Sequence, residues 1–138
     1  MTALALDRAV AVPSLRSQLA GRILTGIVTL LLAFDAGIKL SGSKAALDGT
    51  LQLGYKPHHV LIIGFIALGC LVLYLIPRTA VLGAVLWTAY FGGAVATQLR
   101  LDNPLFSYIL APVYVATLMW LSLYLRDPRV RALIRPAR

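Results

Sequence analysis

Four long runs of apolar residues, separated by short polar stretches, occupy most of the chain from residue 22 onward. Each run is apolar around the whole helical circumference, which is typical of helices surrounded by lipid. At about 1.5 Å of rise per residue, some 20 residues cross a hydrocarbon layer of ~30 Å. The pattern therefore predicts membrane-spanning helices over about residues 22–40, 60–76, 80–99 and 105–125.

The segments between these runs carry signals for helix ends. Residues 41–59 are too polar to span, and Ser43 is a suitable N-cap for a short helix that runs to about Leu53. Thr79 precedes the third run as a plausible N-cap, and Pro112 favours a bend in the fourth. Because the link between the second and third runs is short, those two helices are expected to be antiparallel neighbours.

We therefore predict an all-α fold, an integral membrane four-helix bundle with antiparallel helices. In this prediction, residues 1–18 form a cytoplasmic N-terminal arm, residues 19–126 form the membrane domain, and residues 127–138 form a basic cytoplasmic tail. Cytoplasmic segments carry an excess of Lys and Arg. The termini and the second loop hold nine such residues, against four on the other side, which predicts both termini in the cytoplasm.

Composition supports the membrane assignment and excludes some functions. The chain is 59% hydrophobic and 13% charged, whereas soluble domains average about 25% charged residues. The net charge of +8 does not indicate nucleic-acid binding, because the basic residues lie at the ends of apolar runs. A single cysteine, Cys70, excludes an intramolecular disulfide and a CxxC pair, and we expect it to be a small core residue.

Small residues recur along two of the predicted helices, and small residues let membrane helices approach closely. In the first helix they are Thr25, Thr29, Ala33 and Gly37, and in the third they are Gly83, Ala89, Gly92, Gly93 and Ala96. We expect these positions to be helix-packing contacts and to bring the first and third helices together.

Asp35 and Lys39 are the ionisable residues of the first helix that fall within the membrane. Asp35 lies ~20 Å past Arg22, inside the ~30 Å hydrocarbon layer, and Lys39 follows one turn later, at a spacing that allows a salt bridge. Such residues usually face a helix-bundle interior or a water-filled cavity. A ligand-binding carboxylate and a structural ion pair, with Lys39 or Arg100 as the partner, both remain open.

The third helix becomes polar at its end. Tyr90, Gly93, Thr97 and Arg100 share a helical face, and Gln98 lies beside them. We expect this face and the Asp35–Lys39 pair to form one polar cluster on the outer side of the membrane. Its glycine could admit a hydrophobic ligand such as a quinone or a lipid, whose oxygens would meet the cations; ordinary close packing is the alternative.

Motifs for metal binding or independent catalysis are absent from the sequence. The adjacent His58 and His59 do not share a metal easily on a helix, and no HxxxH or Cys cluster accompanies them. No phosphate loop, serine triad or pair of catalytic carboxylates is present. We therefore expect no metal and no independent catalytic activity, although an enzyme acting on a lipid or a quinone stays open.

Four segments of the chain form a distinctive combination: FDAGIKL (34–40), LGY (53–55), YLIPRTAVLGAVLWTAYFGGAVATQLRLDNPLF (74–106) and YLRDPRVRAL (124–133). In this combination the chain resembles the DoxX-like family of small bacterial membrane proteins. The resemblance covers about residues 20–135. It implies a four-helix membrane bundle and links to quinone-dependent sulfur oxidation and to thiol and oxidant defence. Many relatives carry His at the position of Gln98, and glutamine cannot transfer a proton near neutral pH as histidine can.

Together these features predict an accessory subunit of a quinone- or thiol-linked redox system, with an outer-side pocket for a small hydrophobic ligand. It would be a multi-pass protein of the bacterial inner membrane, in contact with lipid and with membrane or soluble redox proteins. Formation of a homo-oligomer is left open. The alternative is a membrane assembly factor or interaction protein in which the Asp35, Lys39 and Arg100 cluster is purely structural.

Overall fold

The computed structural model describes residues 13–135, which are all-helical, with no strand among them. The predicted N-terminal arm lies mostly outside the described residues, and so does the end of the predicted tail, residues 136–138. In chain order the elements are α2 (Leu15–Leu40), α3 (Lys44–Gln52), α4 (His59–Leu75), α5 (Ala80–Arg100), the π-helix η1 (Leu105–Ile109), α6 (Ala111–Arg126) and α7 (Pro128–Ile134).

Three helical stretches in the described residues are long and apolar enough to cross a membrane. They are α2, α5 and the segment Leu105–Arg126, which contains η1 and α6. Helix α4 is also apolar but has 17 residues, at the lower limit for a span. Large apolar side chains such as Leu30, Phe34 and Phe65 point outward and are more than half exposed, as expected for a surface that meets lipid.

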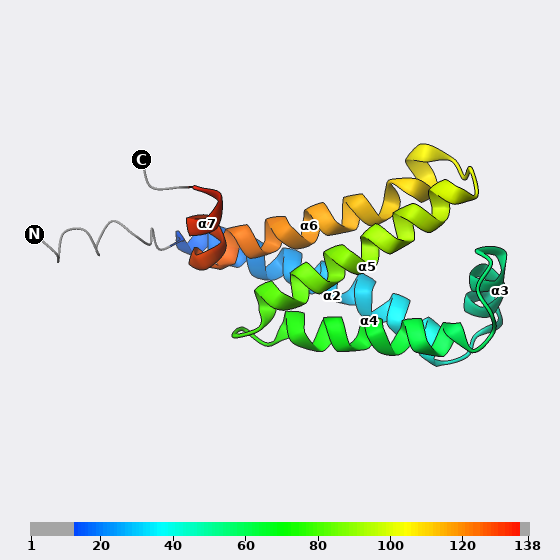
Figure 1. Cartoon of the computed structure of the whole chain (residues 1–138). Helices are drawn as coiled ribbons and strands as arrows, with labels where there is room; N and C mark the ends of the chain where they lie inside the picture. Colours follow the sequence, from blue (N-terminus) through cyan, green and yellow to red (C-terminus); the bar gives the residue numbers. More distant parts are fainter. Residues whose placement is uncertain (1–12, 136–138) are drawn as a thin grey trace, which may run out of the picture.

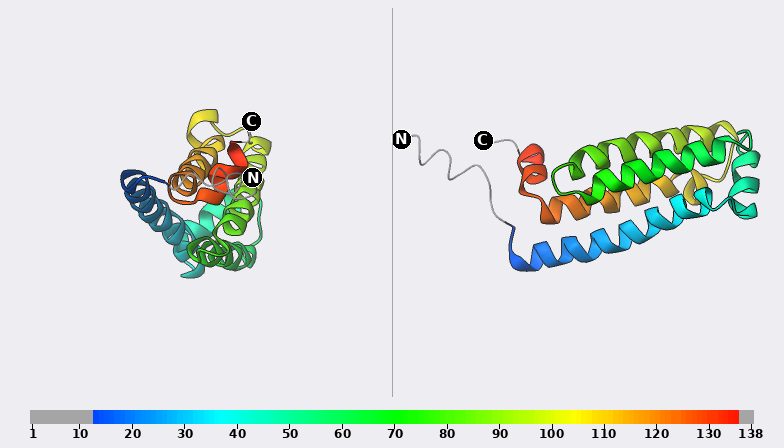
Figure 2. Two further views of the ribbon diagram at one scale, coloured as in Figure 1. Left: turned by 90° about the vertical axis from the view of Figure 1, so that its left-hand side faces the viewer. Right: turned by 90° about the horizontal axis from the view of Figure 1, so that it is seen from below.

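The four long helices contact one another in a closed cycle. Helix α2 packs against α4 and α6, and α5 also packs against α4 and α6. Figure 1 shows α2 and α7 meeting at one end of the molecule and α3 lying at the other, and the second view of Figure 2 agrees. Towards the α3 end, α4 and α6 diverge (Figure 1).

The expected close approach of α2 and α5 through small residues is wrong, because these helices face each other across the cycle. The reason is the size of the side chains between them. Trp87 of α5 is fully buried and belongs to one core cluster with Val28 and Leu32 of α2. A bulky indole at the centre keeps the two backbones apart.

The core fills the half of the molecule next to α7. Its largest fully buried side chains are Trp87, Tyr74, Met119 and Leu123. The Tyr74 hydroxyl shares a buried hydrogen bond of 2.7 Å with the Ser122 hydroxyl, which joins α4 to α6. The buried residues of α5 end at Phe91, so none of its last nine residues is buried in the core.

Gly83 lets α4 and α5 approach closely within this core. A Cβ placed on Gly83 would overlap the backbone nitrogen of Tyr74, and only glycine fits there. Of the small residues expected to mediate packing, Gly83 therefore does so. It joins α5 to α4, however, and not to α2.

The helix ends agree only in part with the sequence prediction. The short helix after Ser43 is confirmed, because the Ser43 hydroxyl accepts a hydrogen bond from the Ala46 amide at 3.3 Å. Thr79 precedes α5 but does not cap it, since its hydroxyl donates to the carbonyl of Leu73 at 2.8 Å. Pro112 does not bend a continuous α-helix but lies in the first turn of α6, after η1.

Helix α7 is fixed to the end of the helix cycle by two arginines. Arg131 donates to the Tyr124 carbonyl at 2.7 Å and to the Ser17 hydroxyl of α2. Arg129 donates to the Pro77 carbonyl at 2.7 Å, between α4 and α5. Desolvation opposes ionisation of Asp127, but hydrogen bonds from Arg129 outweigh it, so the pKa of the Asp127 carboxyl is lowered.

Candidate functional site

A cavity of about 810 Å³ lies between the helices on the side of the core towards α3, with the core residues Leu32, Cys70 and Phe91 in its wall. Ligand sites range from roughly 300 to 1,000 Å³. Its walls come from α2, α4, α5, η1 and the start of α6, and they are largely apolar, with Ile63, Ile66 and Phe91 among them. Of the six predicted polar residues, five line the cavity: Asp35, Lys39, Tyr90, Thr97 and Gln98.

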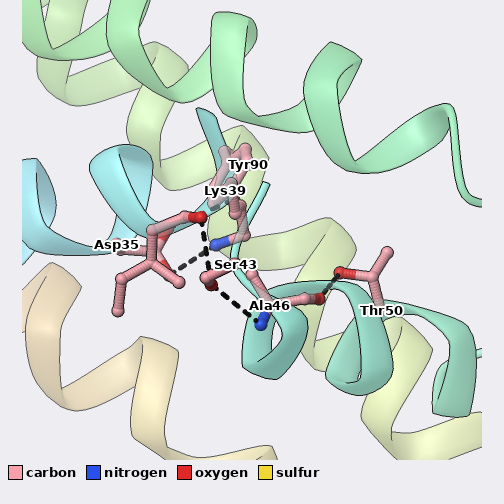
Figure 3. Close-up of polar contacts among 7 residues, drawn as sticks. Asp35, Lys39, Ser43, Ala46, Thr50 and Tyr90 are labelled. Atoms are coloured by element: carbon pink, nitrogen blue, oxygen red, sulfur yellow. Dashed lines mark hydrogen bonds and ion pairs between the residues drawn. The ribbon is translucent and has the colours of Figure 1, made fainter. Parts of the chain in front are cut away.

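Asp35 and Lys39 form an ion pair within α2 (Figure 3). The Lys39 ammonium donates to Oδ1 of Asp35, at the spacing of one helical turn. The other carboxylate oxygen, Oδ2, lies 3.5 Å from the Tyr90 hydroxyl of α5, which is long for an O–H···O bond. The Asp35 side chain is 45% exposed and that of Lys39 is 18% exposed, so the carboxylate is the more accessible partner.

The remaining polar residues of α5 already have protein partners. The Thr97 hydroxyl donates to the Gly93 carbonyl at 2.8 Å and lies 3.0 Å from the hydroxyl of Tyr55. The Gln98 side-chain oxygen accepts from the amide of Asn103. These contacts join the end of α5 to the loop after α3 and to the turn before η1.

Arg100 lies outside the cavity. It is exposed, and its guanidinium donates to the Leu53 carbonyl at 3.1 Å. The pairing of Arg100 with Asp35 that the sequence left open does not form, because α2 and α5 lie across the helix cycle from each other. Arg100 instead connects the end of α5 to the loop that follows α3.

The small residues differ in their surroundings. A Cβ placed on Gly37, Gly92 or Gly93 would meet no atom within 4 Å, so no helix packs closely there. Gly93 and Ala89 line the cavity, where their size leaves space. Ala33 and Ala96 are exposed, and the buried Thr29 hydroxyl has no hydrogen-bond partner in the described part of the chain.

A second cavity, of about 720 Å³, lies between the end of α2, helix α3 and the turn before η1. The two cavities share six lining residues: Asp35, Lys39, Thr50, Leu53, Gln98 and Tyr108. The ion pair therefore lies where the cavities meet. The first cavity leads from it between the apolar helices, and the second leads from it beneath α3.

Several lining residues were missed from the sequence. Thr50, Tyr55 and Tyr108 come from segments read as loop or interface, and the Leu47, Leu51, Tyr55 spacing indicated only a surface helix. Cys70 belongs to the core, as expected, with 7% of its surface exposed, but it also lines the first cavity. No sequence signal distinguishes a core position beside a cavity from one within continuous packing.

Metal ligands do not gather anywhere in residues 13–135, where no group of three or more His, Cys, Asp or Glu side chains could hold an ion. The rings of His58 and His59 lie 4.3 Å apart in an edge-to-face arrangement. Nδ1 of His59 accepts from the backbone amide of Lys56 at 3.2 Å.

Comparison with known families gives one match. The model of the DoxX-like family matches residues 23–122, which is most of the chain and includes Asp35, Cys70 and every cavity-lining residue of α5. Neither a curated protein nor a solved structure matches the chain.

Proposed function

The chain belongs to the DoxX-like family, and we propose that it holds a small hydrophobic ligand in the 810 Å³ cavity beside Asp35 and Lys39. Its apolar helices make it a small membrane protein. We place it in the inner membrane of a bacterium as an antiparallel four-helix bundle of α2, α4, α5 and η1–α6. Both termini face the cytoplasm, so α3 and the ion pair lie towards the outer side.

The observation that carries this proposal is the position of the ion pair at the end of a large apolar cavity. A charged pair inside a membrane segment usually faces an interior or a cavity that uses it. Apolar walls supply affinity for a hydrocarbon body, at about 0.8 kcal/mol per buried CH₂ group, and a few polar groups fix its orientation.

We further propose that the protein is an accessory subunit of a quinone- or thiol-linked redox system and has no catalytic activity of its own. The support is the likeness of its motifs to relatives in such systems. A lipid or a quinone would fit the cavity, and a membrane or soluble redox protein would be the partner. Since Gln98 replaces the histidine of many relatives and is bonded to Asn103, we assign it no role in proton transfer.

The competing proposal is an assembly or interaction protein in which the polar cluster is structural. Its support is that most polar groups around the cavity already have protein partners. Against it, the Asp35–Lys39 pair lies within one helix, and such pairs contribute about 0.3–0.5 kcal/mol without fixing one helix against another. Among the described residues, Asp35 contacts a second helix through the long Tyr90 contact, so we favour ligand binding.

The test is native mass spectrometry of the protein after gentle extraction, in three forms: wild type, Asp35→Asn and the control Asp48→Asn. Asp48 is exposed on α3 and lines neither cavity. We expect a bound small molecule on the wild type and on the control. Asp35→Asn should lose it while unfolding at the same temperature. A ligand-free wild type, or equal retention by all three proteins, contradicts the proposal, and a fixed protein partner without a small molecule supports the competing one.

A further inference from the structure

The accessible group at the end of the cavity is a hydrogen-bond acceptor. From this we infer that the ligand is a neutral amphiphile that donates a hydroxyl to Asp35 and places its hydrocarbon chain in the first cavity. The inference rests on the proposed ligand-binding function and narrows it. It reverses the expectation that cations hold an oxygen-bearing ligand, because Arg100 lies outside the cavity and Lys39 is largely covered.

The Lys39 side chain is covered because it packs on α4. Its Cβ lies so close to Gly64 that a Cβ placed on that glycine would be 3.1 Å away. Its ammonium is bonded to Oδ1 of Asp35, and 18% of the side chain is exposed. The positive charge is therefore held against the wall and already has an anionic partner.

Asp35, in contrast, has unused capacity to accept hydrogen bonds. A carboxylate has about four lone-pair sites on its two oxygens. Among the described residues, Oδ1 is bonded to Lys39, and Oδ2 has the Tyr90 hydroxyl at 3.5 Å, whereas O–H···O bonds are usually about 2.5–3.0 Å long. A ligand hydroxyl at Oδ2 would complete this coordination at the most exposed part of the pair.

The sign of the charges selects a neutral donor over an ion. A ligand anion would be repelled, because the exposed member of the pair is the Asp35 carboxylate. A ligand cation would be attracted only weakly, because Lys39 already neutralises that carboxylate. A hydroxyl bonds to the carboxylate without adding a charge to the membrane interior. Hydrogen bonds to charged groups contribute about twice as much as those between neutral groups.

The junction of the two cavities explains why the ligand is an amphiphile. Asp35 and Lys39 line both cavities. When the ligand hydroxyl is bonded to Asp35, the ligand's hydrocarbon chain can therefore extend into the apolar first cavity. The second cavity has polar side chains from α3, Thr50 and Gln52, and from the turn before η1, Asn103. It therefore offers hydrogen-bonding groups to the head of the ligand.

The experiment compares four matched ten-carbon probes: 1-decanol, methyl decyl ether, decanoate and decyltrimethylammonium. Each is titrated into delipidated wild-type protein, Asp35→Asn and the control Asp48→Asn, and bound probe is measured by native mass spectrometry. We expect 1-decanol to bind about tenfold more tightly than each of the others to the wild type and to the control. In Asp35→Asn the preference for the alcohol over the ether should fall to about twofold.

The outcomes separate the inference from the function on which it rests. If none of the four probes binds the wild type, the ligand-binding function fails and the inference fails with it. If the probes bind but the ether, decanoate or the ammonium matches 1-decanol, the inference is overturned and the cavity function stands. An unchanged preference for the alcohol in Asp35→Asn also overturns it, because the hydroxyl would then be recognised elsewhere.

Discussion

Filling part of the cavity from α5 should weaken ligand binding without harming the fold. The substitution is Gly93→Leu, because Gly93 lines the cavity and a Cβ there meets no atom within 4 Å. The matched control is Gly92→Leu. Gly92 is the neighbouring residue, also has nothing within 4 Å, and does not line the cavity. Both changes remove a helical glycine, which is less favourable than alanine by about 0.5–1 kcal/mol.

The magnitude follows from the volume removed. A leucine side chain adds four carbon atoms, which occupy roughly 100 Å³ at about the volume per molecule of water, an eighth of the 810 Å³ cavity. That space holds about four methylene groups of a ligand, each worth about 0.8 kcal/mol. The upper limit is therefore ~3 kcal/mol, and we expect the dissociation constant to rise at least about tenfold.

The assay is titration of 1-decanol into the wild type, Gly93→Leu and Gly92→Leu, with bound alcohol measured by native mass spectrometry and stability by thermal unfolding in detergent. We expect Gly93→Leu to bind at least about tenfold more weakly and Gly92→Leu to bind like the wild type. Both variants should unfold at the temperature of the wild type or above it. Wild-type affinity in Gly93→Leu, or an equal loss in Gly92→Leu, refutes the assignment of this cavity.

Three further predictions concern stability, each measured by thermal unfolding in detergent. Gly83→Ala should destabilise by about 1–3 kcal/mol or more, because its Cβ would overlap the Tyr74 backbone; an unchanged midpoint would show that α4 and α5 do not approach so closely. Tyr74→Phe should cost about 1 kcal/mol through the lost bond to Ser122, which keeps its bond to a backbone carbonyl; no loss would mean that the bond contributes nothing. Asp127→Asn should lower the midpoint by a few degrees at pH 7. Desolvation raises the folded-state pKa of Asp127, but hydrogen bonds from Arg129 outweigh it and lower that pKa. The stability that Asp127 contributes is therefore present above its unfolded-state pKa of about 3.9 and is lost as the pH falls through the folded-state pKa. A difference in midpoint between the wild type and Asp127→Asn that grows on acidification would contradict this.

The helices could be predicted from the sequence because lipid imposes a simple requirement. A span must be long and apolar, and the segments ending at Leu40, Arg100 and Arg126 satisfy it. The start of α2 was placed seven residues late, at Arg22 and not at Leu15, because polar residues such as Arg16 and Gln18 interrupt the apolar run there. Backbone hydrogen bonding continues the helix beyond the apolar segment.

The packing of α4 against α5 could be predicted from their short connection and is confirmed. The neighbours of α2 could not be predicted, because small residues allow close contact but do not require it. Gly83 meets a backbone, whereas Gly92 and Gly93 meet nothing, although all three lie in one helix. The difference depends on where Trp87 and Tyr74 fill the interior, and that is a property of the packed helices.

The polar residues of the candidate site could be identified, but their roles could not. Ionisable groups are costly within a membrane, so the position of Asp35 and Lys39 in an apolar run is enough to single them out. That Lys39 is covered by α4 and that Arg100 bonds to a loop depends on the spatial arrangement of separate elements. The sequence therefore suggests cationic recognition, whereas the structure presents a carboxylate.

The most direct test of ligand binding in the cavity is an electron cryomicroscopy structure of the protein in a lipid nanodisc, prepared without added ligand. We expect density for an elongated molecule between α2, α4 and α5. One end should carry an oxygen within about 3 Å of the Asp35 carboxylate. An empty or collapsed cavity, with α2 and α5 in contact through Gly37 and Gly93, would contradict it.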